Sequence, residues 1–298
     1  MKTEGIYKTL MEQVDRLARH NRQGSYHTKQ RYYEAMQRFC RFLADEYRLQ
    51  KLSNVSGKHV AAYADYMKAS GKAASTIKTD LAAIRFFHDL LDDRRHPLPG
   101  NSDLHLERRR FGELDRTWSP GEYDRFLEQC RARGHEDYAS IAGLTWEVGL
   151  RIHEGYRLDT AAAEAAIRSG ELTVKGKGGK IRSVPITDNA RAILSAALSR
   201  TKRGHKLFVP DGVPTDRVIH DMQVFIAAVR PDVQDVGSTR PMTHHGLRHS
   251  YAARKYQEFT RCGYSHYDAC KQVSRLLGHE RAEVTRIYLA SINSQVCT

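Results

Sequence analysis

The 298-residue chain lacks the marks of several protein classes. Its five cysteines are odd in number and include no Cys-x-x-Cys pair, which is untypical of a disulfide framework or a zinc site. No apolar run approaches the roughly eighteen residues of a membrane span. Residues 1–21 are charged throughout and have no apolar stretch like that of a signal peptide. We therefore expect a cytoplasmic protein with no membrane partner.

Sequence patterns for metal or nucleotide binding are also missing. Carboxylates, histidines and cysteines do not cluster at metal-ligand spacing. The glycine-rich segment 176–180 has neither P-loop spacing nor a following Ser or Thr, so we do not expect nucleotide binding. The chain is expected to work without a metal or other cofactor.

Positive charge is what the chain has in excess. Its 48 Lys and Arg exceed 35 Asp and Glu, giving a net charge of +13 and a pI near 9.6. The surplus is seven in residues 1–100 and six in the remainder, so both halves are basic. Such a balance favours a polyanionic partner, DNA or RNA, although a basic soluble enzyme of another class has a similar composition.

The first hundred residues predict helices only. Apolar residues recur every three or four positions over 31–47 and again over 60–67, and Gly71 is a suitable stop. Ser75 is a candidate cap for a third helix. The apolar stripe of that helix consists of Ile77, Leu81, Ile84, Phe87 and Leu91. Pro97, Pro99 and Gly100 then precede a linker over 101–117.

A second domain is predicted over 118–298. Ser119 and Glu122 have the spacing of a capping box, with Pro120 at the first helical position. A helix over about 136–149 precedes a β-hairpin, whose alternating strands flank a turn at 176–179. Further helices are expected over 188–198, 215–229, 246–259 and 265–277, the last ending at Gly278. The fold class is thus mainly α with a small β-hairpin.

Six residues in this second domain have the chemistry for breaking a phosphodiester with a tyrosine. They are, in chain order, Arg151, Lys177, His245, Arg248, His279 and Tyr288. Arginine and histidine neutralise and protonate phosphate oxygens, and a tyrosine can attack phosphorus. Each residue alone has an ordinary structural explanation, but the set is specific.

The six residues and their neighbours resemble the tyrosine recombinase (phage integrase) family. Leu247, His249, Leu277 and Gly278 complete the family's His-x-Leu-Arg-His and Leu-Gly-His patterns, and Glu154 follows the first arginine. The resemblance implies an N-terminal helical, SAM-like core-binding domain over 1–100 and an α+β catalytic domain with a C-terminal nucleophile helix. It is detailed over 143–290 and looser over 1–100.

The resemblance implies the following chemistry. Tyr288 attacks the phosphodiester and leaves a 3′-phosphotyrosine and a free 5′ hydroxyl, with no metal or ATP. Arg151 and Arg248 hold the non-bridging oxygens. Lys177 acts as the general acid, His245 assists proton transfer on the nucleophile's side, and His279 donates a hydrogen bond to the phosphate.

The implied partners are double-stranded DNA recombination sites, a tetramer of the chain on two paired sites, and accessory DNA-bending or directionality factors. The bound enzyme would be nucleoid-associated and of the mobile-element integrase type. Candidate DNA contacts are Lys78, Arg85, Arg108, Arg109, Lys175 and Lys180.

Two alternatives remain open. A type IB topoisomerase or a telomere resolvase uses a similar residue set, and a decayed integrase would bind DNA as a regulator without catalysis. The spacing from Arg248 to His279 is 31 residues, which is longer than in compact family members. We expect the additional residues to form a loop near 257–268.

Overall fold

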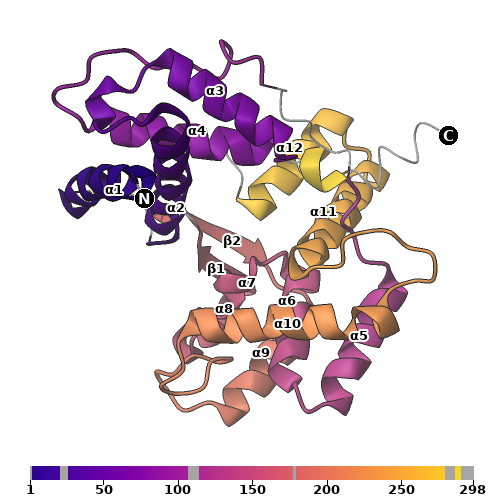
Figure 1. Cartoon of the computed structure of the whole chain (residues 1–298). Helices are drawn as coiled ribbons and strands as arrows, with labels where there is room; N and C mark the ends of the chain where they lie inside the picture. The colour runs from indigo at the N-terminus through magenta and orange to yellow at the C-terminus, as the bar shows by residue number, and fades with distance from the viewer. Residues whose placement is uncertain (1, 21–25, 107–113, 177–178, 279–285, 290–298) are drawn as a thin grey trace. The chain divides into compact units, whose positions relative to one another are not determined.

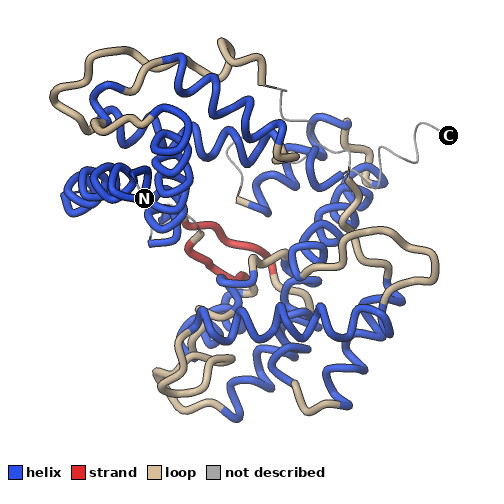
Figure 2. The backbone as a smooth tube through the Cα atoms, in the orientation of Figure 1, coloured by secondary structure: helices blue, strands red, loops and turns tan. Residues whose placement is uncertain are grey.

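The computed structural model is mainly helical (Figures 1 and 2). It describes the chain except residues 1, 21–25, 107–113, 177–178, 279–285 and 290–298. Within the described residues there is one two-stranded sheet, and no helix is long and apolar enough to cross a bilayer. The predicted fold class is therefore confirmed. The chain divides into two compact units, residues 1–109 and 110–298.

The first unit is built from helices around one apolar core. α2 packs against α1 and α4, and α3 packs against α4. The elements are α1 (Lys2–His20), α2 (Tyr26–Phe42), the π-helical turn η1 (Leu43–Tyr47), the 3-10 turn η2 (Leu52–Asn54), α3 (Gly57–Ala69) and α4 (Ala74–Asp89).

The predicted stripe on α4 is largely confirmed. Four of its five apolar side chains are buried, and Leu91, beyond the end of the helix, is half-buried. The prediction that Ser75 caps this helix is wrong. The helix begins at Ala74, and the residue before it, Ala73, makes no side-chain cap. Ser75 therefore lies inside the first turn.

The second unit is organised around α6 (Glu136–Val148), which packs against α5, α9 and α11. α8 covers β1, and α12 contacts β2. Its other elements are α5 (Pro120–Ala132), α7 (Ile152–Gly155), α8 (Thr160–Ser169), β1 (Glu171–Lys175), β2 (Ile181–Pro185), α9 (Asp188–Arg200), α10 (Thr215–Val233), α11 (His244–Arg261), α12 (His266–Leu277) and η4 (Arg286–Leu289).

The hairpin pairs β1 with β2 in antiparallel register, with Leu172 opposite Val184. Both of these side chains and Val174 are buried, whereas the residues between them are exposed or half-buried. This alternation is the pleat of a half-buried sheet.

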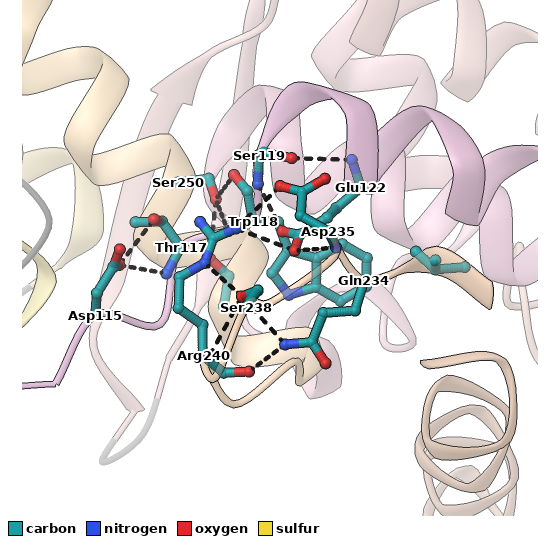
Figure 3. Close-up of polar contacts among 12 residues, drawn as sticks. Asp115, Thr117, Trp118, Ser119, Glu122, Gln234, Asp235, Ser238, Arg240 and Ser250 are labelled. Carbon is teal, nitrogen blue, oxygen red and sulfur yellow. Dashed lines mark hydrogen bonds and ion pairs between the residues drawn. The ribbon is translucent and has the colours of Figure 1, made fainter. Parts of the chain in front are cut away.

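The start of α5 is fixed by the predicted capping box, which the structure confirms. The Ser119 hydroxyl accepts from the Glu122 backbone N–H at 3.1 Å, and the Glu122 carboxylate accepts from the Ser119 N–H at 2.8 Å. The other Glu122 oxygen accepts from Arg240 at 3.0 Å (Figure 3). The loop between α10 and α11 is thereby tied to the beginning of α5.

The segment before α5 is clamped onto α11. The Trp118 N–H donates to the Ser250 hydroxyl at 2.8 Å, and that hydroxyl donates back to the Trp118 carbonyl (Figure 3). The Trp118 indole donates to the Thr243 carbonyl. A Cβ on Gly246 would lie 2.3 Å from the Arg116 carbonyl oxygen, so only glycine permits this approach.

The expected loop near 257–268 is not a long loop. α11 continues to Arg261, and α12 begins at His266 with Ser265 as its cap. A short turn containing Gly263 at φ +85° joins them. The non-helical part of this segment is therefore shorter than expected.

Candidate active site

Arg151 is placed by the end of α6 and the beginning of α7. Gly149 ends α6 in the left-handed region at φ +66°, and Arg151 precedes the first turn of α7. Its backbone N–H and its Nη1 each donate to Glu154 at 2.8 Å. The Glu154 side chain is fully buried, whereas Arg151 keeps 24% of its side chain exposed. The glutamate thus orients an arginine that stays accessible.

Glu154 is shared with a second arginine, on β2. Arg182 donates from Nη1 and Nη2 to the two Glu154 oxygens, both at 2.7 Å, and from Nε to the Leu276 carbonyl at 3.0 Å. Burial alone would raise the pKa of Glu154, but the Arg182 hydrogen bonds and charge lower it to about 2. Glu154 therefore stays ionised, and Arg182 joins α7, the hairpin and the end of α12.

Arg248, on α11, has no exposed surface. Its Nη1 donates to the Gly149 carbonyl and its Nη2 to the Leu277 carbonyl. Its buried Nε has no acceptor among the described residues, and burial lowers its pKa to about 10. A buried donor without a partner is costly, so a phosphate oxygen reaching this guanidinium would satisfy it.

Tyr288 lies in η4 against α11 and keeps only 6% of its surface exposed. Its hydroxyl is 3.4 Å from His245 Nε2. Its ring lies 4.3 Å from the His249 ring, centroid to centroid, and the Arg248 guanidinium carbon is 5.9 Å from the tyrosine centroid. The predicted nucleophile, one predicted histidine and one predicted arginine therefore meet at one point.

The His245 ring is held in its neutral form. Removal of water by the surrounding protein lowers its pKa well below the ordinary value, and the nearby charges on Arg248, Arg116 and Arg151 lower it further. A neutral imidazole with its proton on Nδ1 presents Nε2 as an acceptor. His245 can thus receive a proton from the Tyr288 hydroxyl.

Lys177 and His279 lie outside the described residues, but their neighbours are placed. A Cβ on Gly176 would lie 3.4 Å from Glu154 Oε1 and 3.5 Å from Arg151 Nη1. A Cβ on Gly278 would lie 2.8 Å from the Arg182 Cδ. Gly176 and Gly278, which directly precede Lys177 and His279, therefore both lie beside the Arg151–Glu154–Arg182 group.

The predicted DNA contacts that the structure describes fall on both units. Arg85 donates to the Pro99 carbonyl and to Asn101, so it ties α4 to the following segment within its own unit. Lys78 is half-buried on the same helix, and Lys175 and Lys180 are exposed at the hairpin turn. Arg108 and Arg109 lie outside the described residues. Across the described residues, no cluster of three or more metal-ligating side chains is arranged to hold a metal ion.

The sequence interpretation missed Arg182 and gave no role to His249. Arg182 falls on an exposed-looking alternation of β2, although only 8% of its side chain is exposed. Its only signal in the sequence was a basic residue in the expected hairpin, for which the acidic Glu154 is a possible partner. His249 was read only as a part of the His-x-Leu-Arg-His pattern, and its ring packs against the Tyr288 ring.

Known proteins share this sequence pattern. Residues 117–294 match the family model described as "Phage integrase family", and residues 16–95 match "Phage integrase, N-terminal SAM-like domain". Tyrosine recombinase XerD of Oceanobacillus iheyensis is 24% identical over 261 residues, covering 84% of this chain and 82% of the relative. Tyrosine recombinase XerC of Vibrio parahaemolyticus is 26% identical over 284 residues, covering 89% and 82%.

Solved structures share the fold. A lambda integrase dimer bound to a COC′ core site has a TM-score of 0.67 at 15% identity, covering 93% of this chain and 94% of that one. The Tn1549 transposon integrase in complex with transposon right-end DNA has a TM-score of 0.63 at 15% identity, covering 96% and 98%. Because the first family model spans more than half of the sequence, this chain belongs to the phage integrase family and is a site-specific tyrosine recombinase.

Proposed function

We propose that the chain cleaves and rejoins double-stranded DNA at specific sites through a covalent 3′-phosphotyrosine at Tyr288. The observation that carries the proposal is the meeting of the Tyr288 hydroxyl with His245 Nε2 at 3.4 Å, above the buried guanidinium of Arg248. That distance is long for a hydrogen bond, but catalytic hydrogen bonds commonly tighten when substrate binds.

The chemistry follows from these groups. The Tyr288 oxygen forms a bond to phosphorus as its proton passes to His245, and the bond from phosphorus to the 5′ oxygen breaks. Arg151 and Arg248 stabilise the charge that builds on the non-bridging oxygens. Lys177 supplies the proton for the leaving 5′ oxygen, and His279 positions the phosphate. The phosphotyrosine conserves the energy of the broken bond, so rejoining needs no ATP or metal.

The proposed substrate is a pair of DNA sites held by four copies of the chain, in the manner of a mobile-element integrase. A lambda integrase tetramer bound to a Holliday junction has a TM-score of 0.67 with this chain at 15% identity, and the net charge of +13 suits a polyanion. The alternatives of topoisomerase and inactive regulator are distinguished by the experiment below.

The test uses DNA substrates nicked beside the cleavage position, so that the cut strand loses its 5′-hydroxyl end and cannot be rejoined. Wild type and Tyr288→Phe are compared on denaturing gels with EDTA present. Tyr267→Phe is the matched control because its side chain is exposed on α12. We expect a covalent band from wild type and Tyr267→Phe only.

A covalent band from Tyr288→Phe would refute the nucleophile. Binding without a covalent band from wild type would support the regulator. Relaxation of supercoiled plasmid without recombination would support the topoisomerase.

A further inference from the structure

A cavity of about 440 Å³ opens beside Arg151 and His245. It is lined by residues of α7, of α10 and of the beginning of α11, all within the second unit. Its polar lining residues include Arg151, His153, Gln223, Arg230, His244 and His245. No carboxylate lines it, and its volume falls in the range of small-ligand sites.

The permanent charge of this cavity comes from two arginines. Burial lowers the pKa of His153 and brings that of His244 to about 3, so both rings are neutral at pH 7. Arg151 shares Glu154 with Arg182, which leaves one carboxylate for two guanidinium groups. Arg230 forms no ion pair with any described residue. The cavity is therefore cationic and its walls supply hydrogen-bond donors.

Arg230 is oriented before any ligand arrives. Gln223, Ile226 and Arg230 are spaced by three and four residues, which places them on one face of α10. Ile226 is buried and anchors this face. The Arg230 Nη2 donates to the Met242 carbonyl at 3.0 Å, and its Nε has no acceptor among the described residues. A held guanidinium with an unsatisfied donor loses little entropy on binding an anion.

We propose that this cavity binds a second phosphodiester of the DNA strand, next to the one that is cleaved, with Arg230 as its principal ligand and the Gln223 amide as a second donor. The proposal rests on the proposed function, because DNA that reaches Arg151 and His245 brings its neighbouring phosphate to this cavity. Two arginines on different elements then hold successive phosphates and fix the register of the strand.

The test is a binding cycle on DNA in which single phosphates around the cleavage position are replaced, one at a time, by uncharged methylphosphonate. Proteins carry Tyr288→Phe so that binding is measured without cleavage. Arg230→Gln and Arg230→Lys are compared with Arg217→Gln. Arg217 lies on the same helix, thirteen residues earlier and hence on roughly the opposite face, and 74% of its side chain is exposed.

We expect Arg230→Gln to weaken binding to unmodified DNA by about tenfold or more and to lower the salt slope by about one. Neutralising one phosphate beside the cleavage position should weaken DNA binding by the parent protein by the same factor. It should leave DNA binding by the Arg230→Gln variant almost unchanged. Arg230→Lys should fall between. Arg217→Gln should show no such coupling at that phosphate.

The proposal is overturned if Arg230→Gln weakens DNA binding by the same factor whichever phosphate is neutralised, because the residue then acts only through the fold. Tryptophan fluorescence unfolding checks that the variants fold, and Arg230→Lys keeps the cycle readable if the glutamine variant does not. If wild type forms no covalent complex but the coupling is present, the proposed function fails and the phosphate site stands.

Discussion

The most demanding prediction concerns Arg182→Gln. Glu154 is fully buried and accepts two 2.7 Å hydrogen bonds from this guanidinium, so the substitution leaves a buried carboxylate with only Arg151 as a charged partner. Breaking a buried ion pair by removing one partner costs about 3–5 kcal/mol. Burial raises the pKa of Glu154, and the Arg182 hydrogen bonds and charge outweigh burial and lower it to about 2, so the carboxylate that the variant leaves behind is charged at neutral pH.

The pH dependence has a defined sign. In the wild type the pKa of Glu154 is lower in the folded state, so its stabilisation is complete above pH 4.5 and is lost as pH falls toward 2. Without Arg182 the effect of burial is less opposed, so we expect the pKa of Glu154 to be higher in the folded variant than in the folded wild type. The folded variant can then take up a proton in mild acid, and the cost of Arg182→Gln should be smaller at pH 5 than at pH 7.

The assay is urea unfolding followed by tryptophan fluorescence. Both tryptophans of the chain, Trp118 and Trp146, are buried in the second unit, so the signal reports the unit that contains the site. Arg200→Gln is the control, since its ion pair with Asp137 is about 40% exposed on each side. It should cost less than about 1 kcal/mol. A loss below about 1 kcal/mol for Arg182→Gln, or no dependence on pH, would refute the buried-pair reasoning.

Three further predictions concern the stability of the two units. Gly149→Ala should destabilise the second unit by at least about 1 kcal/mol, because its φ is +66° and the new Cβ would lie 2.4 Å from the Tyr251 ring; an unchanged midpoint would contradict this. Ser250→Ala should cost about 1–3 kcal/mol because it leaves the Trp118 N–H without its acceptor. An unaltered hydrogen-exchange rate of the Trp118 amide would contradict this. Asp80→Asn should cost about 1–3 kcal/mol in the first unit, followed by circular dichroism, because the buried carboxylate accepts from Arg38, whose side chain is 46% exposed, and from the Tyr63 hydroxyl; a loss near zero would mean that these hydrogen bonds do not stabilise the unit.

Local signals in the sequence were sufficient for much of the fold. The capping box at Ser119 and the stop at Gly278 depend on residues a few positions apart, and the structure has both. Helical periodicity likewise located most of the other long helices, because a 3.6-residue repeat is visible without tertiary information, but it did not single out α1 (Lys2–His20). The predicted cap at Ser75 was wrong because the helix begins one residue earlier, at Ala74, without a side-chain cap.

Contacts between distant segments were beyond these signals. Arg182 and Glu154 are 28 residues apart, and nothing in the alternation of β2 distinguishes a buried ion pair from a solvated strand arginine. Arg230 lies in an amphipathic helix like many others, and its relation to Arg151 appears only when α10 is packed beside α7. The meeting of Tyr288 with His245, 43 residues apart, was expected from the family pattern rather than from any local rule.

The central claim is that Tyr288 forms the covalent bond to DNA, and the most direct measurement is mass spectrometry of the trapped complex. After nuclease and trypsin digestion, the peptide that begins at Ile287 contains Tyr288 and no other of the chain's 15 tyrosines. The account predicts that this peptide carries a nucleotide joined through its 3′ phosphate. A nucleotide on any other tyrosine, or one joined through its 5′ phosphate, would contradict it.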